Sequence, residues 1–119
     1  MYRVEKIEKH QYEDIHTLTL SKDESGITLE IPSILFEDLN IDPSKISEVE
    51  VLVSGEKPDL EPWDIVLRAT VFGMKKEGDI ETLCASAGGL QIRIRNPELR
   101  ELADKEKIYL AFKFKTRKT

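Results

Sequence analysis

The chain has 119 residues, a net charge of −5, 39% hydrophobic residues and 34% charged residues. This length suits a single domain over residues 1–119, whose core needs no metal or disulfide for support. No apolar run approaches the roughly 18 residues of a membrane helix, and the opening MYRVEKIEKH is too charged for a signal peptide. Cys84 is the only cysteine, which excludes an internal disulfide and favours a reducing, cytoplasmic location.

The charge is spread unevenly along the chain. Residues 1–62 carry fifteen acidic and six basic side chains, whereas residues 63–119 carry eight acidic and twelve basic ones. A net acidic chain is a poor general binder of nucleic acid, because attraction to phosphates supplies most of that affinity. A solvated surface is the simplest explanation of the basic residues in the second half, and a local contact with a nucleic-acid backbone is the alternative.

Alternation of apolar and polar residues predicts strands from the start of the chain. The first strand begins with Tyr2 and Val4 and loses its apolar phase at Lys6, so that Ile7 falls on the wrong face. Strands at 15–21 and 27–31 follow, and the polar stretch 21–26, which closes with a glycine, predicts the turn between them.

A short helical stretch interrupts the strands in the middle of the chain. Pro32 ends the preceding strand because it has no N–H for the ladder, and Ser33 is expected to cap a helical turn through Leu39. Residues 42–44 form a turn, and the residues from 55 to 63 form a loop with two prolines.

The second half of the chain repeats the pattern of alternating strands. A turn is predicted at 77–79, and Asn96 is expected to cap a helix over 97–105. The predicted strands of this part cover 48–54, 64–76, 80–87, 90–95 and 107–115. The sequence therefore predicts an all-β fold, a single OB-fold-like antiparallel barrel of about eight strands with one or two short helical segments. Gly73 inside a long strand favours a barrel, because glycine permits a bulge.

Residues that could carry catalysis or bind a metal are sparse. His10 and His16 are six apart with no further histidine or cysteine nearby, so surface histidines are expected rather than a zinc site. Cys84 falls in a predicted strand, where a small residue of the barrel wall is the ordinary explanation. No phosphate-binding glycine motif and no serine nucleophile motif is present. We therefore expect no catalytic residues, no cofactor and no metal.

The basic residues of the second half are the candidates for a nucleic-acid contact. Arg93, Arg95, Lys113 and Lys115 fall on the presumed outer faces of two strands. Phe112 and Phe114 share a face with Leu110, so these rings are expected in the core, whereas base stacking needs exposed rings.

The stretch SAGGLQIRI, from Ser86 to Ile94, places two adjacent glycines before a clean alternation. Gly88 and Gly89 form either a hairpin or bulge without a partner, or a surface without side chains that another backbone approaches closely. The two interpretations are compatible, since a bend in a strand can also leave a flat patch outside.

The segment DIVLRATVFGMKKEGDIETLCASAGGLQIRIRNPELRELADKEKIYLAFKF resembles the C-terminal half of the RNA polymerase subunit 8 family, which has eukaryotic and archaeal members. The family has a long strand, an acidic turn, a small-residue strand ending in GGL, an alternating strand, a polar helical stretch and a hydrophobic last strand. The N-terminal half resembles it more loosely. The short loop at 55–63 and the amide-poor, Glu- and Lys-rich composition resemble the archaeal members rather than the eukaryotic ones.

The resemblance implies a non-catalytic accessory subunit of an archaeal DNA-directed RNA polymerase, docked on the largest subunit in a structural and assembly role. The residues expected to dock are Gly88, Gly89, Leu90, Gln91 and Arg93. Arg93, Arg95, Lys113 and Lys115 are expected to give at most a weak contact with single-stranded nucleic acid. The isolated chain is expected to be a monomer without a membrane partner. The alternative is a free-standing OB-fold protein that binds single-stranded nucleic acid, and an enzyme with its site at Cys84 or among the carboxylates has no supporting motif.

Overall fold

The computed structural model describes residues 1–95, 102 and 106–117. Eight strands and two short helical segments account for the described elements. They are β1 (Tyr2–Lys9), β2 (Ile15–Lys22), β3 (Ser25–Pro32), α1 (Ser33–Asp38), η1 (Pro43–Lys45), β4 (Ile46–Ser54), β5 (Ile65–Glu77), β6 (Ile80–Ala87), β7 (Leu90–Arg95) and β8 (Lys107–Thr116). None of the described helices is long and apolar enough to cross a membrane.

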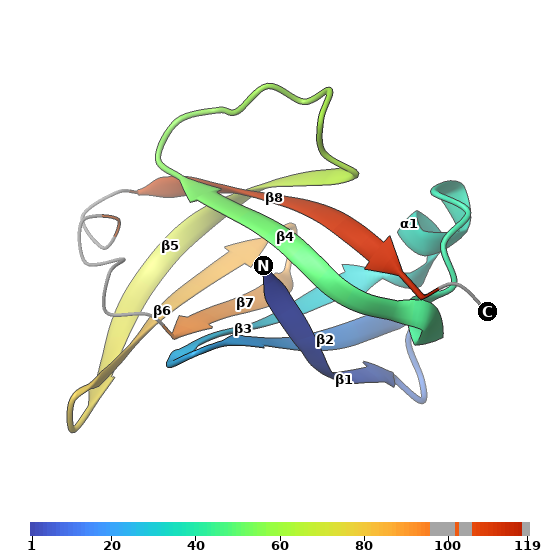
Figure 1. The fold of residues 1–119 in the computed structure, drawn as a ribbon. Helices are drawn as coiled ribbons and strands as arrows, with labels where there is room; N and C mark the ends of the chain where they lie inside the picture. The colour runs from blue at the N-terminus through green and yellow to red at the C-terminus, as the bar shows by residue number, and fades with distance from the viewer. Residues whose placement is uncertain (96–101, 103–105, 118–119) are drawn as a thin grey trace.

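The strands close into one barrel in the order β1-β2-β3-β7-β6-β5-β8-β4 (Figure 1). Every neighbouring pair is antiparallel, including the β1–β4 pair that closes the ring. The predicted all-β antiparallel barrel of about eight strands is therefore confirmed. Figure 1 shows α1 at one end of the barrel and the β5–β6 hairpin projecting from the other.

The two halves of the chain have the same arrangement of strands. β1, β2 and β3 form a meander with β4 beside β1, and β5, β6 and β7 form a meander with β8 beside β5. The halves join through the β3–β7 and β4–β8 pairs. Each half thus contributes four neighbouring strands to the ring.

The first strand of each half carries a bulge. The register with the next strand shifts between Val4 and Lys6 in β1, and between Val71 and Gly73 in β5. One extra residue reverses the inward and outward alternation, so Ile7 returns to the inner side opposite the buried Leu18. The loss of phase predicted at Lys6 is this bulge, and Gly73 lies beside the second one.

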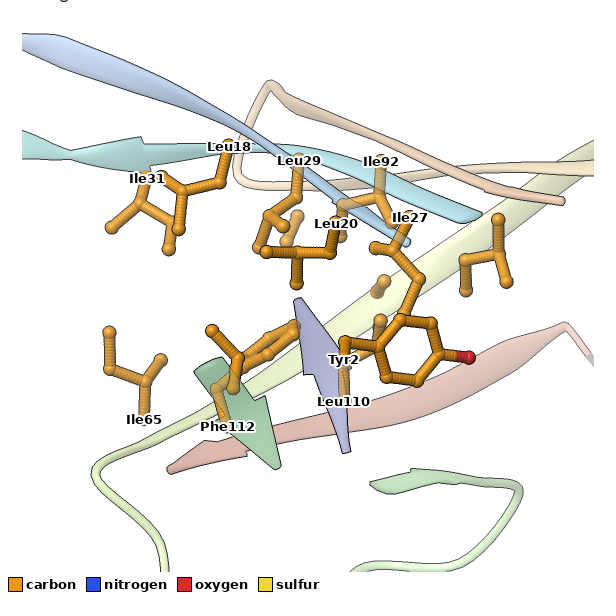
Figure 2. Packing of buried hydrophobic residues seen from close by; sticks show 14 of the residues in the cluster. Tyr2, Leu18, Leu20, Ile27, Leu29, Ile31, Ile65, Ile92, Leu110 and Phe112 are labelled. Atoms are coloured by element: carbon orange, nitrogen blue, oxygen red, sulfur yellow. The ribbon is translucent and has the colours of Figure 1, made fainter. Parts of the chain in front are cut away.

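The inner faces of both halves supply the core. Figure 2 shows aliphatic side chains of β2, β3 and β7 packing toward Leu110 and Phe112 of β8. Along β8, the alternate residues Ile108, Leu110 and Phe112 have no exposed surface, and Phe114 is 8% exposed. The prediction that Phe112 and Phe114 face inward is confirmed.

Helix α1 covers the end of the barrel, with Phe36 as its most deeply buried apolar residue. Phe36 is 1% exposed, and its ring lies 5.4 Å from the His16 ring and 5.7 Å from the Phe114 ring between centroids. The predicted cap is wrong in detail. Ser33 is the first helical residue, Pro32 occupies the cap position, and no side chain caps the helix. Ser33 is instead engaged by His16, whose Nδ1 lies 2.7 Å from its Oγ.

The turn between β2 and β3 is tighter than predicted. Lys22 pairs with Ser25, so Asp23 and Glu24 form the turn, and Asp23 adopts a positive φ of 52°. Gly26 is not part of the turn but a paired residue of β3. The predicted turns at 77–79 and before β7 are present. The helix predicted over 97–105 with its Asn96 cap lies outside the described residues, apart from Leu102.

Candidate functional surfaces

Gly88 and Gly89 form the two-residue turn of the β6–β7 hairpin. Ala87 pairs with Leu90 across the turn, and the glycines have φ angles of 56° and 87°. Positive φ at both positions is the requirement of a type I′ turn, which glycine meets without strain. A Cβ atom added at either glycine would meet nothing within 4 Å. The turn therefore explains the glycine pair, and it also leaves an exposed surface without side chains.

The strand after this turn places its predicted docking residues on two faces. Leu90 is half-buried and Gln91 is exposed. The Gln91 N–H donates a 2.6 Å hydrogen bond to Oε1 of Glu30, which ties the start of β7 to β3. Arg93 faces outward between the buried Ile92 and Ile94. Its guanidinium lies 5.2 Å from the centroid of the Phe72 ring, within the range of a cation–π contact.

A groove of about 550 Å³ lies on the outer side of the sheet formed by β1, β2, β3, β7 and β6. Its three basic residues, Arg3, Arg93 and Arg95, come from both ends of the sequence. Within the described part of the chain, no ion pair joins any of these arginines to a carboxylate. The other lining residues are Glu5, Thr19, Leu20, Ser21, Asp23, Gly26, Ile27, Thr28 and Thr82. Guanidinium groups over a floor rich in hydroxyl groups are suited to an anion.

Gly26 makes room for Arg95 in this groove. The two residues are paired across β3 and β7, and a Cβ atom at Gly26 would lie 3.2 Å from Nη2 of Arg95. The guanidinium therefore lies over the backbone of β3. Sequence reasoning misses Arg3 as a member of this set, because only the pairing of β3 with the distant β7 brings β1 near β7.

Lys113 and Lys115 lie on a different side of the barrel from Arg93 and Arg95. Neither lysine lines the groove, which β1, β2, β3, β7 and β6 form. On β8 the two lysines are exposed and stand opposite Glu50 and Glu48 of β4. Opposite charges that face each other across a strand pair compensate one another. The structure therefore does not unite the four predicted basic residues in one groove.

The histidines are half-buried and hydrogen-bonded rather than on the open surface. Nε2 of His10 lies 2.6 Å from Oγ1 of Thr17, and His16 contacts Ser33 and Phe36. Burial, together with the positive charge of Lys9, lowers the pKa of His16 below its usual value of 6.5. Among the residues the structure describes, no group of three potential ligands could hold a metal ion.

Cys84 is a half-buried residue of the barrel wall. It pairs with Gly73 on one side and Arg93 on the other, and its Sγ lies 3.8 Å from the Thr82 carbonyl oxygen. This placement fits the interpretation of a small wall residue.

Comparison of the chain with known protein families gave no match, and comparison with curated proteins gave none either.

Proposed function

We propose that this chain is a non-catalytic accessory subunit of an archaeal DNA-directed RNA polymerase, located in the cytoplasm and docked on the largest subunit. The observation that carries the proposal is the β6–β7 turn. The sequence around it is the most distinctive part of the resemblance to polymerase subunit 8, and its glycines have open space around them. A partner backbone can approach such a turn closely, because no side chain stands in the way.

A barrel with an open hairpin tip suits a structural and assembly role. Gly88 and Gly89 stand at a hairpin tip, and the hydrogen bond from the Gln91 N–H to the Glu30 carboxylate links that hairpin to the neighbouring strand. A surface held in this way loses little freedom when it docks, which favours assembly.

A tagged pull-down from the native host at moderate salt tests the proposal. The large polymerase subunits are expected in stoichiometric amounts. Gly88→Asp is expected to reduce their recovery, because aspartate tolerates a positive φ while adding a charged side chain to the turn. Ile80→Asp is the control, since Ile80 is 50% exposed at the β5–β6 hairpin, at the other end of the barrel.

Equal recovery with Gly88→Asp and the unaltered chain would contradict docking through this turn. Absence of the polymerase from the pull-down of the unaltered chain would contradict the assignment as a whole. Urea unfolding of both variants shows whether a loss of recovery reflects a lost contact or a lost fold.

A second candidate function is the binding of single-stranded nucleic acid in the arginine groove. The observation that favours it is a groove lined by three arginines, one of which, Arg93, lies against Phe72, a residue that is 57% exposed. Guanidinium groups bind phosphates, and an exposed ring offers a surface for a base. The net charge of −5 opposes this function.

Fluorescence anisotropy with a labelled oligothymidylate tests the second function. Binding is expected to weaken with salt and to be lost when Arg93 and Arg95 are both replaced by glutamine. Replacement of Lys113 and Lys115 by glutamine removes the same charge from the other side of the barrel and is expected to have little effect. Equal losses from the two double variants would show that only net charge matters.

A further inference from the structure

The lining of the arginine groove includes a row of five outer residues, one from each of its strands. Arg3 pairs with Ser21, Ser21 with Gly26, Gly26 with Arg95 and Arg95 with Thr82, and all five line the groove. Neighbouring strands lie about 4.8 Å apart, so three strand spacings separate the backbones of Arg3 and Arg95 by about 14 Å. The two arginines therefore line opposite sides of the groove, with a serine and a glycine between them.

The Arg95 side chain extends into the groove on the side of Arg3. A Cβ atom added at Gly26 would lie 3.2 Å from its Nη2 and 3.5 Å from its Cζ, so the guanidinium lies over β3 rather than over β6. In the sheet, β3 is the neighbour of β7 on the side of β2 and β1. Because Gly26 has no side chain, the guanidinium reaches toward the middle of the groove.

Arg93 is oriented the other way. Its Nη1 donates a 3.0 Å hydrogen bond to the carbonyl oxygen of Ile92, and its guanidinium lies 5.2 Å from the centroid of the Phe72 ring. Phe72 belongs to β5, and β6 lies between β5 and β7, so this guanidinium turns away from β3. Arg3 and Arg95 are thus the two cations on either side of the groove, and Arg93 adds charge nearby.

Neither Arg3 nor Arg95 is paired with a carboxylate within the described part of the chain, where the ion pairs join other residues. Two like charges that share one groove repel each other, and an anion between them removes that repulsion. Guanidinium groups bind phosphate through two parallel hydrogen bonds. Further hydroxyl donors in the groove are those of Thr19, Thr28 and Thr82. The groove therefore has the chemistry of a phosphate site.

Carboxylates lie around the arginines and limit the extent of the positive surface. Glu5 and Asp23 line the groove itself. Next to it, Arg95 also borders a second hollow, whose acidic lining residues are Glu24, Glu77 and Asp79. A long polyanion that continued past the arginines would meet these negative charges. The site thus favours a compact anion over an extended nucleic-acid strand.

We propose that the arginine groove binds a compact polyphosphate between Arg3 and Arg95. The groove volume of about 550 Å³ exceeds what one phosphate ion fills and lies within the range of small-molecule sites. Inorganic triphosphate and the triphosphate group of a nucleotide share this chemistry. The inference goes beyond the proposed function, because it concerns a small ligand near Arg95, at the end of β7 opposite the glycine turn.

Amide NMR titration of the purified chain with sodium tripolyphosphate at low salt tests the proposal. Shifts are expected at the residues that line the groove. Arg3→Gln and Arg95→Gln are each expected to weaken binding at least about tenfold, because each removes a hydrogen-bonded charge from the ligand. Arg93→Gln is expected to have a smaller effect. Lys113→Gln removes the same charge outside the groove and is expected to have almost none. The spectra also show whether each variant keeps its fold.

Two further ligands identify the source of the phosphate groups and the size limit of the site. ATP is expected to shift the same residues. Tighter binding than that of tripolyphosphate would identify a nucleotide, whereas equal or weaker binding would identify the phosphate chain alone. An oligothymidylate is expected to bind more weakly than tripolyphosphate at equal phosphate concentration. The double variant Glu5→Gln and Asp23→Asn is expected to strengthen oligothymidylate binding, because it removes two charges that repel the strand.

Three results would overturn the proposal. The first is the absence of shifts at the groove with tripolyphosphate. The second is an equal loss of binding from Arg95→Gln and Lys113→Gln, which would show that only net charge matters. The third is tighter binding of oligothymidylate than of tripolyphosphate, which would assign the groove to nucleic acid. None of these measurements involves the polymerase, so their outcome is independent of the pull-down.

Discussion

A Cβ atom added at Gly26 would lie 3.2 Å from Nη2 of Arg95, so the guanidinium of β7 uses space that a side chain on β3 would take. The contact involves the flexible end of an arginine, which can shift by a few tenths of an ångström. Gly26→Ala is therefore expected to change the free energy of unfolding by less than about 1 kcal/mol, since alanine also reduces the entropy of the unfolded chain. Urea unfolding measures this change.

Gly26→Leu tests whether oligothymidylate binding depends on the position of Arg95 rather than only on the charge of the groove. The larger side chain is expected to displace the guanidinium and to weaken oligothymidylate binding as much as Arg95→Gln does, although it removes no charge. Anisotropy titrations of the two variants and of Gly26→Ala make the comparison. Unchanged binding by a folded Gly26→Leu variant would show that the position of Arg95 does not matter.

The β6–β7 turn gives a second prediction, about backbone conformation. Gly88 has a φ of 56° and open space around it, so strain rather than a clash determines the effect of substitution. Gly88→Asn is expected to be nearly neutral, because Asn-Gly is a favoured type I′ pair. Gly88→Val is expected to destabilise the chain by at least about 1–2 kcal/mol, because a β-branched residue is strained in a left-handed conformation. Urea unfolding compares the two. Equal stability would mean that the turn is not type I′.

Sequence analysis predicts most of the strands but not their order in the barrel. Alternation places one strand at 90–95, where β7 lies, and another at 15–21, within one residue of β2, because inward and outward faces differ locally in polarity. The insertion of β8 between β5 and β4 depends on pairing between distant segments, which local alternation does not encode. That insertion determines which charged residues of β8 and β4 face each other.

The candidate functional surfaces are likewise only partly predictable from the sequence. The turn at Gly88 and Gly89 is predictable because it has a local signature. The grouping of Arg3 with Arg93 and Arg95 is not, because these residues are far apart in the chain and meet only through the pairing of β3 with β7. Lys113 does not line this groove, and it stands opposite Glu50 across the β4–β8 pair.

Helix α1 gives a prediction about the closed end of the barrel. Phe36 is 1% exposed, whereas Ile34 in the same helix is 58% exposed. Phe36→Ala is expected to cost about 3–5 kcal/mol, because it leaves a cavity against Phe114. Ile34→Ala is the matched control, and its effect is expected to stay within about 0.5 kcal/mol. Urea unfolding measures both. Similar losses from the two substitutions would contradict the role of Phe36 as the residue that covers the barrel end.

The lowered pKa of His16 predicts how the stability of the folded chain depends on pH. Burial and the charge of Lys9 lower its pKa below 6.5 in the folded chain, against the opposing effect of Asp14. The unfolded chain therefore binds a proton at a higher pH than the folded chain does, and the folded state loses stability as pH falls through about 6.5. The loss ends once the pH is below the pKa of the folded state, where both states are protonated.

His16→Gln isolates this contribution from the carboxylates that titrate at lower pH. The difference in unfolding free energy between the unaltered chain and His16→Gln is expected to move in favour of the variant between about pH 7.5 and 5.5. Urea unfolding at several pH values gives this difference, and NMR titration of the imidazole gives the pKa directly. A difference that is constant with pH, or a pKa above 6.5, would show that protonated His16 is accommodated next to Ser33 and Phe36 without cost.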